Sequence, residues 1–391
     1  MAHRWSLRSP SPEVTSCGGP LTLFVLQKAL FLIVAVLQGR ALADILFRWD
    51  ATHFLRIAED GYSLPSPARP NSNLAMFPLL PMLTRTLAAI TPLNPPQSLI
   101  VIAWSGTLLA ALGIFVFVRE LTDGRVATIA VLLWGAAPHS FVQLLGYTEG
   151  AFTATVAWSL WALRRERWLL AGMIAGLGAL LRSTGALLAI TLAVYAVGLW
   201  LLSRRRAIGE TSDSRPGWRE LLRRLACTTL PGGLALAAVL LHVALRLGSL
   251  TGYFDVQRAW GTTLGSPLGT WREIAPYWSS TDPTMTPYTR DIGVILLVAL
   301  VLVIALIGWG GSSRERWPMT FFTVGLYALT VCTLGYPQSK ARFLLPGFGM
   351  WVPIAVALAR LPTLVIALVI AGATAWSVHV DSGLAVGPWS P

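Results

Sequence analysis

A carboxylate on a segment with helical periodicity is the clearest candidate for catalysis in this 391-residue chain. Residues 43 to 61 end in Gly61, which is typical of a helix C-cap. Asp50 falls on the edge of the apolar face, with His53 three residues later. A carboxylate there loses hydration that a cation or hydrogen bond must replace, and under these conditions it can serve as a general base. The helix is predicted to be amphipathic and interfacial, with an apolar face of Phe47, Ala51, Phe54, Leu55, Ile57 and Ala58 and a polar face of Arg48, Thr52, Arg56, Glu59 and Asp60.

The same residues allow a purely structural interpretation. Asp50 would cap the helix near its start, or pair with Arg48 or a later arginine. Arginine and tryptophan commonly anchor helices at a membrane interface, which would account for Arg48 and Trp49, and a single histidine such as His53 is often only hydrogen-bonded. Both interpretations of Asp50 stay open on the residues alone.

A proline-interrupted apolar stretch, Met76 to Pro81, follows this helix. It is too short to cross a bilayer before Pro92, and non-helical backbone at membrane depth occurs where it is buried in protein or lines a cavity. Phe77 and Pro78 therefore indicate either a re-entrant segment beside an entrance for a lipid substrate or the first turn of an interfacial helix.

Further charged residues lie at the ends of apolar runs. Glu149 begins one run after Tyr147 and Thr148, and Arg182 separates two others. Charge at membrane depth is costly and often marks function, and an arginine fork suits the phosphate of a lipid. The alternatives are a glutamate stabilised by a helix dipole and cations that snorkel to the surface. Lys340 and Arg342 form a similar basic pair before a late run.

The elements that must position these residues are long apolar runs. Hydrophobic residues make up 54% of the chain and charged residues 12%, and many runs are near the ~20 residues that cross a bilayer as a helix. The sequence therefore predicts one all-α membrane bundle over residues 1–391, with about eleven spans rather than barrel strands. The clear runs are about 21–39, 97–118, 126–144, 148–163, 185–202, 225–245, 291–309, 318–336 and 361–380, and the weaker ones 168–181 and 343–359.

Basic residues orient the predicted spans. Arginines near 119–125, 164–167, 203–224 and 314–316 fall on alternate connections, as do Arg4 and Arg8, which assigns these connections to the cytoplasm. The connections at 164–167 and 203–224 share a side only if 168–202 is a hairpin with its tip at 182–185. The long loops 41–96 and 246–290 and the C-terminus then lie outside. Lys28 is expected to snorkel near the cytoplasmic end of the first span.

Charge and cysteine content exclude other kinds of site. The net charge of +12 would suggest nucleic acid in a soluble protein, but these basic residues flank apolar runs, so no nucleic-acid partner is expected. Cys17, Cys227 and Cys332 are scattered and lack CxxC or histidine partners. Neither a disulfide framework nor a metal site is therefore indicated.

These motifs together resemble the PIG-V family of membrane mannosyltransferases, which includes GPI mannosyltransferase 2. The run from Arg48 to Phe54, then Ile57-Ala58, Gly61-Tyr62 and Phe77 to Pro81, is similar in order and spacing. Tyr147 to Glu149 resembles the family's Ser-Glu-Ser-type motif, Arg182 to Gly185 its Arg-Ser-Asn-Gly, and Arg342-Phe343 a late Arg-Phe. The chain departs from the family at Gly150 and Thr184, and these departures concern the expected acceptor contacts.

The resemblance implies a GT-C glycosyltransferase that takes mannose from a polyprenyl-phosphate carrier, with Asp50 as base and inversion at C1. It would act on the external face of a bacterial plasma membrane or the lumenal face of the endoplasmic reticulum. Expected partners are membrane lipids, the polyprenyl-phosphate sugar donor and a glycolipid or glycan acceptor. No cofactor is required, while a divalent metal ion and a partner subunit are left open. The expected substrate-binding residues are Arg48, Trp49, His53, Tyr62, Phe77, Pro78, Tyr147, Glu149, Arg182, Lys340 and Arg342.

The alternative function is a lipid or sugar transporter or flippase without glycosyl transfer. Charges inside its membrane spans would form a substrate or ion path. We would expect inverted repeats with broken spans in matching halves, and the sequence has no internal repeat. A structural or assembly subunit without catalysis is a third interpretation.

Overall fold

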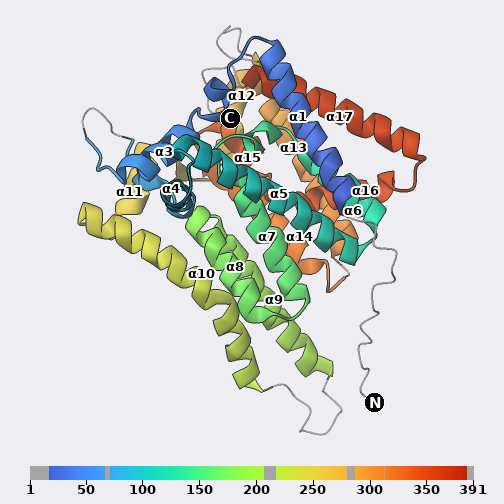
Figure 1. Ribbon diagram of the computed structural model, residues 1–391. Helices are drawn as coiled ribbons and strands as arrows, with labels where there is room; N and C mark the ends of the chain where they lie inside the picture. The colour runs from blue at the N-terminus through green and yellow to red at the C-terminus, as the bar shows by residue number, and fades with distance from the viewer. Residues whose placement is uncertain (1–16, 67–70, 207–216, 280–286, 312, 385–391) are drawn as a thin grey trace.

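The described part of the chain is almost entirely helical (Figure 1). The computed structural model describes residues 17–66, 71–206, 217–279, 287–311 and 313–384, so Arg4, Arg8 and the C-terminus lie outside these ranges. The predicted all-α membrane bundle is confirmed. Its α-helices are α1 Gly18–Leu37, α2 Leu42–Leu46, α3 Asp50–Asp60, α4 Leu79–Ile90, α5 Pro95–Leu121, α6 Gly124–Gly135, α7 Glu149–Arg164, α8 Trp168–Leu181, α9 Gly185–Arg206, α10 Trp218–Leu247, α11 Gly252–Ala259, α12 Pro267–Ser279, α13 Pro287–Gly310, α14 Trp317–Cys332, α15 Lys340–Phe343, α16 Val352–Leu358 and α17 Thr363–Leu384.

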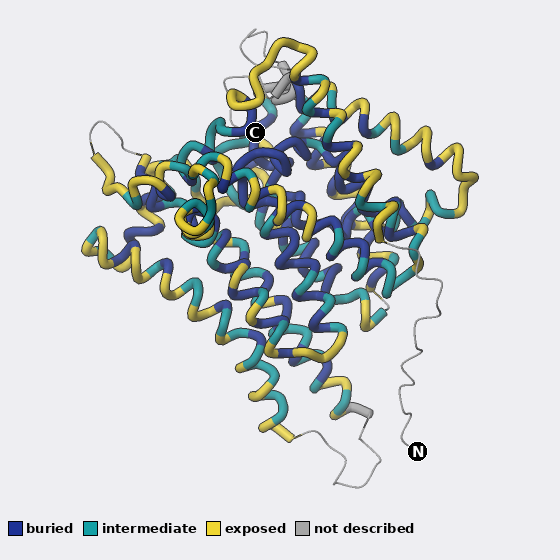
Figure 2. Tube along the Cα trace, in the orientation of Figure 1, coloured by how far each residue is buried: buried dark blue, intermediate teal, exposed yellow. Residues whose placement is uncertain are grey.

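Short elements interrupt the bundle at one end. They are the 3₁₀ turns η1 Asn73–Ala75, η2 Ser140–Gln143, η4 Pro337–Ser339 and η5 Phe348–Trp351, and the strands β1 Thr263–Leu264 and β2 Thr333–Leu334. β1 and β2 pair antiparallel, with Thr263 opposite Leu334. Buried residues gather in the middle of the bundle, whereas apolar side chains are exposed along α1, α10 and α17 (Figure 2). An apolar outer face of this kind fits contact with lipid.

Fewer helices than expected are long enough to cross a membrane. By length and composition six described helices qualify, within α1, α5, α9, α10, α13 and α17, and a seventh if the pair Pro337–Phe343 and Phe348–Leu358, bent by 75°, is one span. The prediction of about eleven spans is therefore not confirmed. The apolar helices α6, α8 and α14 have 12, 14 and 16 residues. At 1.5 Å per residue each covers roughly 18–24 Å of a hydrocarbon core of about 30 Å.

The predicted hairpin over 168–202 is present as α8 and α9. The ring of Trp168, at the start of α8, lies 6.3 Å from that of Tyr195 on α9, as an antiparallel pair requires. Glycine lets α10 approach α8 closely, because a Cβ on Gly172 would lie 1.9 Å from the carbonyl oxygen of Cys227. Small residues at such contacts are typical of helices that pack inside membranes.

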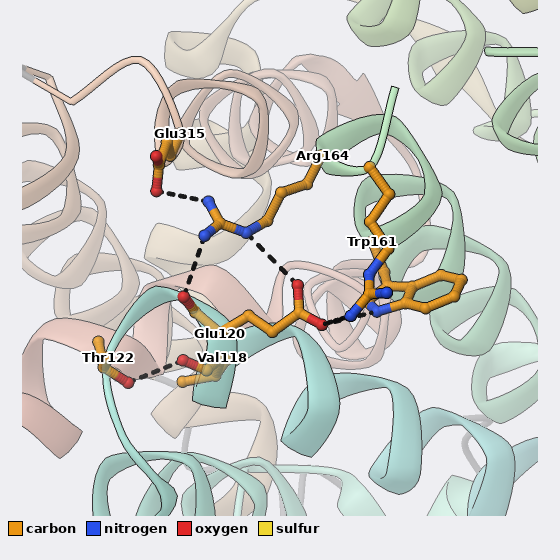
Figure 3. Close-up of polar contacts among 7 residues, drawn as sticks. Val118, Glu120, Thr122, Trp161, Arg164 and Glu315 are labelled. Carbon is orange, nitrogen blue, oxygen red and sulfur yellow. Dashed lines mark hydrogen bonds and ion pairs between the residues drawn. The ribbon is translucent and has the colours of Figure 1, made fainter. Parts of the chain in front are cut away.

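Three basic connections meet at one end of the bundle, which we call the arginine end (Figure 3). Arg164, the last residue of α7, donates to the carbonyl oxygen of Glu120 at the α5–α6 connection. The same guanidinium pairs with the Glu120 carboxylate at 3.5 Å and with Glu315 before α14. These connections were all assigned to one side of the membrane, and the structure brings them together.

The predicted continuous helix over 43–61 is wrong. It breaks between α2 and α3, where Trp49 has a φ of +50° that a right-handed helix does not allow. The α3 part keeps its predicted apolar face, because Ala51, Phe54 and Ile57 are buried. It ends at Gly61 with a φ of +86°, as the C-cap prediction requires.

Candidate active site

Four charged side chains from distant segments converge near the starts of α3 and α7, and we call them the charged cluster: Asp50, Glu149, Arg182 and Arg342. Arg342 Nη1 lies 2.7 Å from Asp50 Oδ2 and 3.8 Å from Glu149 Oε1. Arg182 Nη1 lies 2.6 Å from the same Glu149 oxygen. Since Glu149 begins the 16-residue α7 and Arg164 ends it, the cluster lies roughly 24 Å along that helix from the arginine end.

Asp50 is the most accessible carboxylate of the cluster. It is the first residue of α3, and its backbone N–H donates to the Tyr147 hydroxyl at 3.3 Å. Its side chain pairs with Arg342 and is 23% exposed. The structural interpretation of Asp50 therefore holds in part, since it begins a helix and has a cation partner. The partner is Arg342 rather than Arg48, and the second oxygen, Oδ1, makes no hydrogen bond with the described residues.

Glu149 is buried at the start of α7. Its side chain is 1% exposed and pairs with Arg182, which also donates to Thr148 Oγ1 at 3.2 Å. Glu149 lies in the first turn of α7, as the structural alternative expects, although the Thr148 side chain makes no cap hydrogen bond. Its role in substrate binding stays a prediction. The next residue, Gly150, cannot carry a side chain here, since a Cβ would lie 2.1 Å from Thr107 Oγ1. Close packing of α5 against α7 explains this departure from the family pattern.

Arg342 lies between the two carboxylates and two aromatic rings. Its guanidinium carbon is 5.1 Å from the ring centre of Tyr147 and 5.2 Å from that of Phe343. The side chain is 8% exposed, and its Nε has no hydrogen-bond partner among the described residues. Two arginines balance two carboxylates, and both guanidiniums keep donors with which an anionic group can be bound.

His53 on α3 and Trp49 just before it lie next to the cluster, and His53 contacts the second long loop. The His53 ring lies 5.0 Å from that of Trp260, edge to face. Burial lowers the pKa of His53 below its usual value, the Asp50 carboxylate opposes this, and Arg56 reinforces it. Trp49 packs edge to face against Phe141 at 6.5 Å. Arg48 stacks on the Trp49 ring at 4.4 Å, so it stabilises the bend between α2 and α3.

Tyr62 and Phe77 lie in a separate apolar group that joins the two long loops. The Tyr62 hydroxyl donates to the Met76 carbonyl at 3.0 Å, and burial raises the pKa of this hydroxyl. The Phe77 ring packs against Tyr253 at 6.0 Å. Pro78 directly precedes α4, so the structure favours an ordinary helix start over a re-entrant segment.

Lys340 does not join the charged cluster. Its side chain is fully buried, and its ammonium donates to the carbonyl oxygens of Thr330, at 3.3 Å, and Thr333. These carbonyls lie at the C-terminal end of α14, where a cation is favourable. The expected substrate contact of Lys340 is thus replaced by a structural one.

A second buried polar group, around Lys28 and Asp381, escaped the sequence reasoning. Lys28 does not snorkel, because its ammonium donates to the carbonyl oxygen of Gly135 at 2.6 Å and to Ser140 Oγ at 3.0 Å. Asp381 on α17 accepts from the backbone N–H groups of His139 and Phe141 at 3.0 and 2.9 Å. This network holds the turn before Tyr147. Unpaired charges in the first and last apolar runs were the available signal.

Within the described ranges, no three His, Cys, Asp or Glu side chains gather closely enough to hold a metal ion. The charged cluster offers two carboxylates next to two guanidiniums, and this set of side chains suits an anion better than a cation.

Comparison with known proteins shows similarity to mannosyltransferases. Residues 76–209 match the family model for dolichyl-phosphate-mannose-protein mannosyltransferase. Over 195 residues the chain is 27% identical to GPI alpha-1,6-mannosyltransferase 2 of Mus musculus, across 47% of this chain. The resemblance to the PIG-V family is confirmed. The match spans 37% of the mouse protein, so the chain corresponds to less than half of that relative.

Solved membrane glycosyltransferases share the fold. An Archaeoglobus fulgidus oligosaccharyltransferase tethered to an acceptor peptide has a TM-score of 0.55 and 14% identity, covering 97% of this chain and 56% of the other. ArnT from Cupriavidus metallidurans bound to undecaprenyl phosphate has a TM-score of 0.51 and 14% identity, covering 95% and 76%. The architecture is therefore GT-C-like.

Proposed function

We propose that this protein transfers mannose from a polyprenyl-phosphate mannose donor to a glycolipid or glycan acceptor at the external or lumenal membrane face. The main support is the charged cluster, in which the partly exposed Asp50 carboxylate lies 2.7 Å from the buried Arg342. The cluster lies near the first residue of α7, at the other end of this helix from the arginine end. The sequence similarity to mannosyltransferases supports the choice of sugar.

Asp50 is the proposed catalytic base. Its side chain is partly exposed, and Oδ1 accepts no hydrogen bond from the described residues. This oxygen is suited to accept the proton of an acceptor hydroxyl as the hydroxyl oxygen attacks C1 of the mannose. Glu149 is too buried for this role, since 1% of its side chain is exposed. One carboxylate acting in a single displacement leads to inversion at C1.

Arg342 and Arg182 are the proposed phosphate ligands. As the new C1–O bond forms, the bond between C1 and the phosphate oxygen breaks, and its electron pair stays on the leaving polyprenyl phosphate. Guanidiniums near that oxygen stabilise the developing charge. The products are the mannosylated acceptor, with its proton on Asp50, and polyprenyl phosphate. The leaving group is an anion and needs no proton, so the mechanism requires no general acid and no cofactor.

The decisive assay is transfer of radiolabelled mannose from polyprenyl-phosphate mannose by membranes that contain the protein. We expect label in endogenous lipid or protein acceptors that is absent from membranes without the protein. No transfer across a broad acceptor panel would reject the enzyme hypothesis. Movement of the intact donor across vesicles without new glycosidic bonds would instead favour a flippase.

A further inference from the structure

The segment that carries Arg342 begins with a strained turn. Gly335 and Tyr336 both have positive φ angles, +84° and +48°. The first position admits only glycine, because a Cβ on Gly335 would lie 2.2 Å from the carbonyl oxygen of Gly261. Strained backbone of this kind persists only where neighbouring groups fix it, and it gathers at functional sites.

The second long loop supplies the groups that fix this turn. Glu273 on α12 accepts from the backbone N–H of Gly335 with its two oxygens, at 3.0 and 3.2 Å. Just before the turn, β2 pairs with β1 of the same loop, and Gly265 N–H donates to the carbonyl oxygen of Cys332 at 2.7 Å. The loop therefore holds the chain on both sides of Leu334.

Glu273 makes no ion pair with the described residues, although its carboxylate lies within electrostatic reach of the buried Lys340 ammonium. A charged group placed on a single backbone amide is a strong hydrogen-bond acceptor. Its effect is therefore concentrated on the position of Gly335 rather than on a neighbouring side chain.

The turn leads into the segment that joins the charged cluster. After η4, Arg342 on α15 reaches Asp50 and Glu149. A shift of the Gly335 amide would therefore move Arg342 relative to Asp50.

We propose that Glu273 is a positioning residue, which clamps the Gly335 amide and thereby fixes Arg342 for binding the phosphate of the lipid carrier. The identity of that ligand rests on the proposed function. Glu273 itself is not expected to touch substrate, because its carboxylate is occupied by the turn.

The test measures binding of a polyprenyl phosphate to the purified full-length protein in detergent. Glu273→Ala should weaken binding about tenfold, the scale of one lost hydrogen bond to a charged group. Glu273→Gln keeps an acceptor oxygen for the Gly335 N–H and should restore binding to near the wild-type value. Asp255→Ala is the matched control, since this exposed carboxylate of the same loop pairs only with Arg258 and Thr251 among the described residues.

Equal losses in Glu273→Ala and Glu273→Gln would overturn the clamp in favour of a charge effect on Lys340, and unchanged binding in Glu273→Ala would overturn it outright. If Glu273→Ala does not fold, Glu273→Asp takes its place, and an intermediate loss is expected. In an Arg342→Lys background, Glu273→Ala should weaken carrier binding less than it does in the wild type, because both substitutions act on the contact between Arg342 and the phosphate. Fully additive losses would contradict the inference.

Binding is measured without turnover, so the two proposals fail separately. A wild-type protein that binds polyprenyl phosphate but transfers no mannose contradicts the proposed function and leaves the clamp standing. A wild-type protein that transfers mannose while Glu273→Ala binds carrier normally contradicts the clamp alone.

Discussion

The Nη1 atom of Arg342 lies 2.7 Å from Oδ2 of Asp50, although 292 residues separate the two in sequence. Asp50 therefore enters the site already paired with the cation that we propose binds the donor phosphate. The pair holds the proposed base and the proposed phosphate ligand in one site. Inversion at C1 requires the acceptor hydroxyl to attack the face opposite the leaving phosphate, so the sugar must lie between the acceptor hydroxyl on Asp50 and the phosphate.

Replacement of Asp50 tests this arrangement. Asp50→Asn keeps the shape of the side chain but removes the proton acceptor, so we expect the mannose transfer rate to fall by about 10²- to 10⁴-fold. Expression should change little, because the side chain is partly exposed. Asp44→Asn on α2, an exposed first-turn carboxylate, is the control and should stay active. An active Asp50→Asn would remove Asp50 as the base.

The buried pair of Glu149 and Arg182 should support the fold as well as the site. Glu149→Gln leaves the partner cation uncompensated, and breaking a buried ion pair typically destabilises a protein by about 3–5 kcal/mol. We expect a clearly lower unfolding temperature in detergent. Adding Arg182→Gln should recover part of the loss, because both charges are then gone.

Glu220→Gln is the control for that experiment, since its pairs with Arg223 and Arg224 lie on a partly exposed helix surface. Surface pairs contribute about 0–1 kcal/mol, so its effect should be small. Unfolding temperatures that are equal for Glu149→Gln and Glu220→Gln would show that the pair in the charged cluster is not structural.

Local residue patterns were enough to predict the helical class, the α8–α9 hairpin and the apolar face of α3. The distribution of basic residues also predicts that the connections at Arg164, Glu120 and Glu315 lie on one side of the membrane. These features depend on residue types and their spacing along the chain. The sequence likewise nominated all four members of the charged cluster, partly through the family resemblance.

The partners of those residues were not predictable, because they come from contacts between distant segments. No residue near Asp50 in sequence predicts its pairing with Arg342. The sequence also does not distinguish Lys340 from Arg342, and only the structure shows that Lys340 binds carbonyl oxygens at the end of α14. The break at Trp49 was missed for a related reason. The Trp49 ring packs against Phe141, which lies in another part of the chain, so the residues around Trp49 do not reveal this contact.

Close packing of α8 against α10 gives a prediction outside the site. Gly172→Ala should destabilise the protein, because its Cβ would lie 1.9 Å from the backbone carbonyl oxygen of Cys227, so a helix must move. Gly233→Ala on α10 is the matched control, with no atom within 4 Å of the added Cβ. It should be neutral or stabilising, since alanine favours helix. Equal unfolding temperatures for the two variants would contradict this packing.

The pH dependence of stability should contain a contribution from His53, beside that of the buried His139, whose pKa burial also lowers. Burial lowers the pKa of His53 below its usual 6.5, so the folded protein binds this proton less readily than the unfolded chain does. The contribution to stability is therefore fully present above about pH 6.5 and declines as the pH falls through that value toward the folded pKa. His53→Gln removes the titration, and its unfolding temperature should fall less than that of the wild type between about pH 7.5 and pH 5.5. Equal slopes for His53→Gln and the wild type would show that His53 does not contribute.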